Sequence, residues 1–191
     1  MPTAMIHRLT NRLEALATGR VILVFFGLAM IFAVLIVPTV GAQIEGYSGG
    51  VSLIDLNLTY SPQTAREMVG AYGAEGRSLY RLFALTGDVL YPVVYSTLTA
   101  LLITWLFRRG GPAVWRWRAV ALVPFGAMIF DWLENVGIVT MLSLYPNFPN
   151  WVARAASICT TTKWAFGVAA VLLVLFGLVA ALRNGFKSGS A

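Results

Sequence analysis

Four long apolar segments alternate with more polar connections along this 191-residue chain. Each segment has the roughly 20 residues that a helix needs to cross a hydrocarbon core of about 30 Å. Lipid offers no partners to backbone polar groups, so segments of this length cross as helices. The pattern predicts an all-α integral membrane protein, a four-helix transmembrane bundle with spans at 21–41, 80–107, 119–144 and 152–182.

The connection between the first two spans is long, at residues 42–79, and too apolar for a disordered loop, so an ordered outer cap is expected. Apolar and polar residues alternate from Leu56 to Tyr60, which predicts a short strand. Ser61 followed by Pro62 predicts the start of a short helix that ends near Ala71. The remaining parts of this single domain are an interfacial segment (1–20), a basic loop (108–118), a short outer loop (145–151) and a tail (183–191).

The charge pattern predicts the orientation of the spans. An apolar fraction of 58% against 12% charged residues excludes an ordinary soluble domain. The chain has 14 Lys and Arg against 8 Asp and Glu. In a chain this apolar, the surplus basic residues are expected to lie at one face of a lipid bilayer and not to bind a nucleic acid. If the spans alternate, nine basic residues share one side: Arg8, Arg12, Arg20, Arg108, Arg109, Arg116, Arg118, Arg183 and Lys187. Both termini are then cytoplasmic in a multi-pass protein, located in the plasma (inner) membrane of a bacterial host.

The N-terminal segments have two interpretations. Residues 5–16 place apolar side chains on one helical face with arginines beside it, which predicts a short helix lying in the inner interface. The first span could instead be a signal peptide cleaved before Gln43, after a basic n-region. We favour a retained helix, because the apolar stretch is longer than the usual core of a signal peptide.

Ionisable residues inside the spans mark the candidate site, because such residues are costly in lipid and usually functional. Asp88 lies in the second span, Asp131 and Glu134 in the third, and Lys163 in the fourth. At about 1.5 Å per residue, Asp88, Glu134 and Lys163 lie roughly 15–18 Å from the outer ends of their helices. Four ionisable side chains from three helices are therefore expected at similar depth.

Neighbouring polar residues extend this site. Pro92 is expected to kink the second span and to free the backbone carbonyl of Asp88 for another partner. Asn135 follows Glu134 on the same face of the third span, since residues three and four apart share a helical face. The candidate ligand-binding residues are Tyr91, Tyr95, Asp131, Asn135, Thr160 and Arg81.

Three carboxylates facing one ammonium leave a surplus of negative charge, so at least one carboxyl group is expected to hold a proton. This arrangement would suit acid/base catalysis on a lipophilic or amphipathic small molecule. In that hypothesis Asp88 or Glu134 is the acid or base, and Lys163 holds an anionic headgroup or stabilises developing charge. Whether Lys163 pairs with Asp88, Asp131 or Glu134 is left open.

Three other interpretations remain. The same carboxylates could drive a proton-coupled transporter, which with four helices would require a homo-oligomer. A non-catalytic assembly protein could use the buried charges only to fix helix register. Asp88, Asp131, Glu134 and Asn135 could hold an oxygen-preferring cation, although Lys163 among them argues for no metal. The sequence points to no cofactor, and the single Cys159 and His7 exclude an intramolecular disulfide and a bis-histidine haem site.

Overall fold

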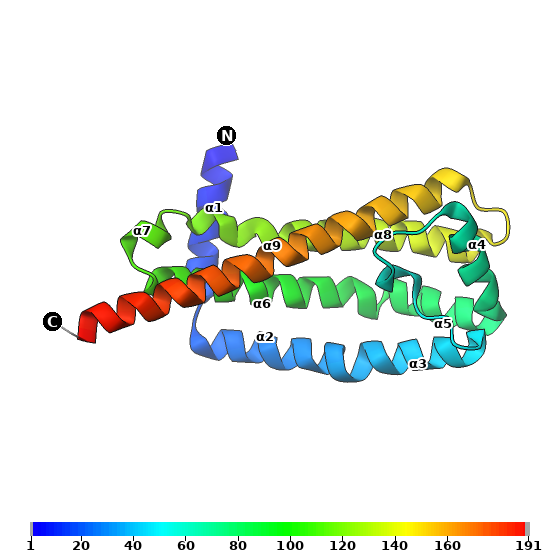
Figure 1. The fold of residues 1–191 in the computed structure, drawn as a ribbon, viewed down its shortest axis with the longest axis horizontal. Helices are drawn as coiled ribbons and strands as arrows, with labels where there is room; N and C mark the ends of the chain where they lie inside the picture. Colours follow the sequence, from blue (N-terminus) through cyan, green and yellow to red (C-terminus); the bar gives the residue numbers. More distant parts are fainter. Residues whose placement is uncertain (1, 190–191) are drawn as a thin grey trace.

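Four long apolar helices dominate the computed structural model, which describes residues 2–189, with side chains for residues 5–185. The helices that are long and apolar enough to cross a membrane are Gly19–Ser48, Gly87–Arg109, Arg118–Leu144 and Asn150–Gly185. They run along the long axis of the molecule, and both termini lie toward the same end (Figure 1). The prediction of four apolar, helical spans is confirmed.

The first of these helices is continuous but changes its winding halfway. It consists of α2 (Gly19–Ile31), the π-helical segment η1 (Phe32–Ile36) and α3 (Val37–Ser48). Pro38, which has no backbone N–H to donate, follows the π-helical segment. The wider turn of a π-helix accommodates the missing hydrogen bond. None of the residues of α2 or η1 is buried in the chain itself, as expected of a helix whose outer side faces lipid.

The other three helices pack against one another. They are α6 (Gly87–Arg109), α8 (Val123–Leu144), which follows the short 3₁₀ segment η3 (Arg118–Leu122), and α9 (Asn150–Gly189). Each of the three contacts the other two, whereas α2 packs on α6. At Gly137 α8 approaches α9 closely, since a Cβ atom there would lie 2.7 Å from the Cβ of Ala156. Small residues thus set the α8–α9 spacing.

The predicted second span differs from the structure at its start. One helix was expected from residue 80, but the chain forms α5 (Gly73–Leu85) and then α6, with Thr86 non-helical between them. The Thr86 hydroxyl donates to the carbonyl of Leu82, and the Phe83 ring lies where a side chain at Gly87 would be. Arg81 therefore belongs to α5 and does not share a continuous helical face with Asp88.

The connection between α3 and α6, residues 49–86, is called the cap below. It contains the short 3₁₀ segment η2 (Ile54–Leu56), α4 (Pro62–Ala71) and α5, and α4 lies at the end of the molecule opposite the termini (Figure 1). The predicted helix start is confirmed, because the Ser61 hydroxyl accepts a hydrogen bond from the backbone N–H of Thr64 at 3.1 Å.

The predicted strand from Leu56 to Tyr60 is wrong, since the described residues contain no strand. The segment leaves the 3₁₀ turn at Leu56 and bends at residues 57 and 58, and side chains of α9 hydrogen-bond to its backbone in place of a neighbouring strand. The N–H of Tyr60 donates to the Ser157 hydroxyl at 2.9 Å, and the Thr161 hydroxyl donates to the carbonyl of Leu58 at 2.7 Å. The cap is thereby fastened to α9.

This fastening gives a first testable prediction. Ser157→Ala removes the acceptor of the buried Tyr60 N–H, and an unsatisfied buried donor costs about 1–3 kcal/mol. Amide hydrogen exchange of residues 57–61 should accelerate at least about fivefold, since each 1.4 kcal/mol is a factor of ten and the lower cost of about 1 kcal/mol is a factor of about five. Thr162→Ala is the matched control, because the Thr162 hydroxyl donates only to the Ile158 carbonyl of its own helix. Equal protection in both variants would contradict the docking.

The end that bears the termini is organised by α1 (Pro2–Leu16), which runs across the ends of the long helices (Figure 1). The predicted helix over residues 5–16 is confirmed. Leu13 is buried against the ends of the long helices, and Glu14 forms an ion pair with Arg118 at 3.4 Å. The short helix α7 (Pro112–Trp115) lies at the same end, between α6 and η3.

Candidate functional site

Lys163 on α9 faces two carboxylates of α8. Its Nζ lies 2.5 Å from Oε2 of Glu134 and 3.6 Å from Oδ1 of Asp131. Asp131 and Glu134 are three residues apart, so one face of α8 presents both to α9. Asp88 has no ion pair with Lys163 within 4.0 Å, so of the three partners left open by the sequence the structure brings two to Lys163.

Both carboxylates also accept hydrogen bonds from neutral hydroxyl groups. The Thr160 hydroxyl, one turn before Lys163, donates to Oε1 of the fully buried Glu134 at 2.6 Å. The Tyr95 hydroxyl on α6 donates to Oδ2 of Asp131 at 2.8 Å. Buried charges are tolerated when they are paired and hydrogen-bonded, and both carboxylates meet that condition.

The backbone carbonyl of Asp88, which Pro92 leaves without a donor in its own helix, accepts a hydrogen bond from α8. Pro92 lies four residues after Asp88 and has no N–H to donate to the Asp88 carbonyl, which instead accepts from Nδ2 of Asn135 at 3.0 Å. The prediction that Pro92 frees the Asp88 carbonyl for another partner is confirmed. The hydrogen bond from Asn135 connects α6 to α8. The Asp88 side chain is only 7% exposed.

A cavity of about 350 Å³ lies beside these residues, within the range typical of small-molecule sites. Its walls come from the first long helix, the cap, α6, α8 and α9. Apolar and aromatic side chains form most of the walls, and three carboxylates and Lys163 lie among them. The lining residues are Ala33, Val37, Asp55, Leu56, Phe83, Asp88, Tyr91, Tyr95, Ala127, Asp131, Lys163, Trp164 and Gly167.

Asp55 is the charged residue of this site that the sequence analysis did not identify. It lies on η2 in the cap, lines the cavity and accepts a hydrogen bond from the Tyr80 hydroxyl at 2.5 Å. Burial and the neighbouring Asp55 raise the pKa of the Tyr80 hydroxyl well above its ordinary value, so this hydroxyl remains a donor. A signal existed, because Asp55 interrupts a run of apolar residues, of which Leu53 and Ile54 are buried.

The first long helix closes one side of the cavity through aromatic contacts. The Phe32 ring stacks on Tyr91 with centroids 5.3 Å apart, and Tyr91 meets Tyr95 edge-on at 5.3 Å. Phe32 begins the π-helical segment, and Ala33 within it lines the cavity. Such segments occur often at functional sites, because they re-aim side chains within a helix.

The predicted site residues therefore divide into three groups. Those lining the cavity are Asp88, Tyr91, Tyr95, Asp131 and Lys163. The second group lies outside the cavity wall and contacts residues at or near it through the ion pair and hydrogen bonds described above; its members are Glu134, Asn135 and Thr160. Arg81 on α5 is half-buried and does not line the cavity.

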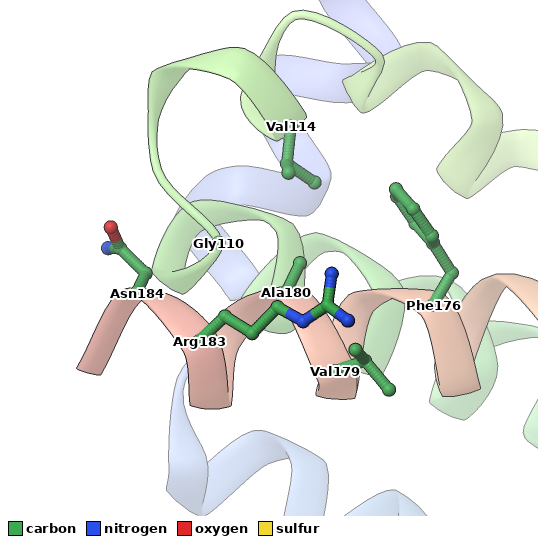
Figure 2. Close-up of a pocket in the computed structure, with 7 residues that line it drawn as sticks. All are labelled: Gly110, Val114, Phe176, Val179, Ala180, Arg183 and Asn184. Atoms are coloured by element: carbon green, nitrogen blue, oxygen red, sulfur yellow. The ribbon is translucent and has the colours of Figure 1, made fainter. Parts of the chain in front are cut away.

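A second cavity of about 260 Å³ lies at the opposite end, where α9 passes the end of α6 and α7. Figure 2 shows Phe176 and Val114 over an apolar floor, with the Arg183 side chain extending along α9. Asn184 points away and donates to the carbonyl of Arg109 at 2.9 Å. Among the described residues that line this cavity, Arg183 is the only charged one, and no acid accompanies it there.

Metal ligation has no support in the part of the chain that the structure describes, where no three His, Cys, Asp or Glu side chains are grouped to hold an ion. Comparison with known proteins adds no assignment: no family model, no curated protein and no solved structure matches the chain.

Proposed function

We propose that this chain is a multi-pass integral membrane protein, a four-helix transmembrane bundle that binds a lipophilic or amphipathic small molecule in the cavity beneath its cap. The observation that carries this proposal is the composition of the cavity wall. Apolar and aromatic surface surrounds a few polar groups, Asp55, Asp88, Asp131 and Lys163. Small-molecule sites have this composition, with apolar area for affinity and a few polar groups for orientation.

The orientation that we propose places both termini in the cytoplasm and the cap outside. The arginines of α1, of the α6–α8 connection and of the end of α9 lie at the end that bears the termini. Basic residues are enriched on the cytoplasmic side of membrane proteins. In a bacterial host this places the cavity in the outer part of the inner membrane.

Two partly exposed residues suggest how a ligand enters. Leu56 of the cap and Trp164 of α9 both line the cavity and are 54% and 44% exposed. The cavity therefore reaches the surface between the cap and α9, where the acyl region of the bilayer would lie. An amphipathic molecule would enter sideways from the membrane and keep its polar group near Asp88.

The proposed roles of the charged residues follow from their contacts. Lys163 already faces two carboxylates, so we assign it a structural part in orienting Asp131 and not the binding of an anionic headgroup. In the enzymatic version of the proposal, Asp88 is the acid or base, because it lines the cavity and Glu134 does not.

Filling the cavity tests this proposal. Gly167 lines the cavity, and a Cβ atom there would meet nothing within 4 Å, so Gly167→Leu should occupy ligand space without steric strain. The amount of co-purified small molecule, quantified by mass spectrometry after extraction, should fall at least about fivefold relative to the unsubstituted chain, because the leucine removes room for the ligand.

Ala165→Leu is the matched control, since Ala165 lies on the exposed face of the same helix and does not line the cavity. Equal loss in both variants would contradict binding in this cavity. A chain that purifies without any stoichiometric small molecule, and whose Asp88→Asn and Lys163→Met variants leave the host unaffected, would favour the register-fixing role. Proton-dependent solute uptake into vesicles would favour the transporter.

A further inference from the structure

The charges around the cavity do not balance. Asp55, Asp88 and Asp131 line it, and Glu134 lies directly behind it, while Lys163 is the only basic residue in its wall. Formally this places four carboxylates against one ammonium. The imbalance distinguishes this cavity from the one at the opposite end, where Arg183 is the only charged residue among the described side chains of the lining.

The single ammonium is already engaged. Lys163 lies within 4.0 Å of both Asp131 and Glu134, and these two carboxylates also accept from Tyr95 and Thr160. Asp131, Glu134 and Lys163 thus form a connected group on α8 and α9. Asp131 and Lys163 also line the cavity, but their charges already face each other.

Asp55 and Asp88 differ from this group. Each lines the cavity, and in the described part of the chain neither has a Lys, Arg or His nitrogen within 4.0 Å. Two arginines of the cap are directed elsewhere: Arg77 lies over the Tyr145 ring, and Arg66 over the Phe148 ring. The third, Arg81, does not line the cavity and forms no ion pair with Asp55 or Asp88 within 4.0 Å. Asp88 is more than nine-tenths buried, a placement that is costly for a carboxylate without a cationic partner.

The rest of the wall suits a cation that carries an apolar body. Tyr91, Tyr95 and Trp164 supply ring faces, which attract ammonium groups. Leu56, Phe83 and Val37 supply apolar surface for a hydrocarbon part. A bare metal ion would need a shell of oxygen ligands, and no such grouping exists among the described residues.

We propose that the molecule bound in this cavity is a lipophilic amine, whose positively charged nitrogen lies between the carboxylates of Asp55 and Asp88 and whose hydrocarbon part lies against the apolar wall. This inference rests on the proposed function and narrows it to a ligand class. An anionic amphiphile would meet the uncompensated carboxylates and be repelled, and a neutral one would leave them unpaired.

Three probes of equal chain length test the inference on the full chain in phosphatidylcholine nanodiscs. Radiolabelled decylamine, decanol and decanoate carry a positive, neutral and negative polar group at neutral pH. Binding is measured by retention on the nanodisc, after subtraction of empty nanodiscs. Decylamine should bind saturably and at least about tenfold more tightly than decanol, because a hydrogen bond to a charged group contributes about 1.5–3 kcal/mol.

Matched variants assign the effect to the cavity. Asp88→Asn keeps the shape of the side chain and should weaken decylamine binding at least about fivefold, because it removes one of the two charges that face the nitrogen. Glu67→Gln removes an acid on the exposed face of α4, outside the cavity wall, and should leave decylamine binding unchanged.

The outcomes separate the inference from the proposed function. Decanol or decanoate could bind saturably and as tightly as decylamine, with this binding lost in Gly167→Leu. That result would overturn the proposal of an amine ligand but would still support ligand binding in the cavity. Decylamine binding that is equal in Asp88→Asn and Glu67→Gln would also overturn the amine site. If none of the three probes binds saturably, both the amine and the proposed cavity function fail.

Discussion

Lys163→Met is expected to lower the free energy of unfolding by about 3–5 kcal/mol, the largest effect of any single substitution considered for this chain. The methionine retains most of the volume of the lysine but removes the ammonium between Glu134 and Asp131. Glu134 has no exposed surface, so its carboxylate would be left buried and without a cation. Breaking a buried ion pair on one side is destabilising mainly because the remaining charge is uncompensated.

Equilibrium unfolding in mixed detergent micelles measures this effect, and two further variants control it. Arg154→Met removes a basic residue from the exposed face of the same helix and should change stability by less than about 0.5 kcal/mol. The double variant Glu134→Gln with Lys163→Met should recover part of the loss, because the remaining side chain is neutral. A Lys163→Met protein as stable as the Arg154→Met protein would show that the ion pair contributes nothing.

Gly137→Leu is expected to cost about 3 kcal/mol, because it enters a close approach of α8 to α9. Even a Cβ atom at Gly137 would lie 2.7 Å from the Cβ of Ala156 and 3.5 Å from its Cα, so a leucine forces the helices apart. Glu134 lies one turn away on α8 and Thr160 one turn away on α9. The hydrogen bond between them should weaken together with the helix contact.

The matched control for this prediction is Gly167→Leu. It makes the same chemical change within the fourth long helix, but a Cβ atom there meets nothing within 4 Å, so stability should be retained. Both variants are unfolded in the same mixed micelles as the lysine variants. Equal loss of stability in the two glycine variants would mean that leucine is harmful for a reason other than the α8–α9 approach.

The spans could be predicted from the sequence because the information is local. Length and apolar character decide whether a segment can cross lipid, and the third and fourth long helices begin and end within a few residues of the prediction, whereas the first continues to Ser48 and the second begins only at Gly87. The cap helix was equally local, since Ser61 and Pro62 define an N-terminus without any tertiary contact. The break at Thr86 was missed, because it depends on how Phe83 packs over Gly87.

The polar contacts within the spans followed partly from spacing. Asp131 and Glu134 share a face of α8, and Pro92 frees the Asp88 carbonyl. Both features depend only on residues three or four positions apart, so the sequence alone predicts them. Which acid pairs with Lys163 depends on how α8 and α9 are rotated and shifted relative to each other. That geometry arises from packing at Gly137 and Ala156 and could not be read from either helix alone.

The missing part of the site came from segments far away in the sequence. Asp55 reaches the cavity because the cap folds back onto α9, through hydrogen bonds of Leu58 and Tyr60 to Thr161 and Ser157. The same bonds explain why an alternating segment forms no strand. Ala33 and Val37 line the cavity because α2 packs on α6 and α3 on α5, and no local pattern indicates those contacts.

A photo-cross-link from the cavity wall tests the central claim most directly. Trp164, which is partly exposed, is replaced by the larger photoreactive aromatic amino acid benzoylphenylalanine, and the full chain is irradiated in native membranes. Leu172, which is 60% exposed and outside the cavity wall, receives the same replacement as a control for contact with bulk lipid. We predict a discrete small-molecule adduct at position 164 that is absent at position 172. The same adducts at both positions, in proportion to the bulk lipids, would contradict a ligand-binding cavity.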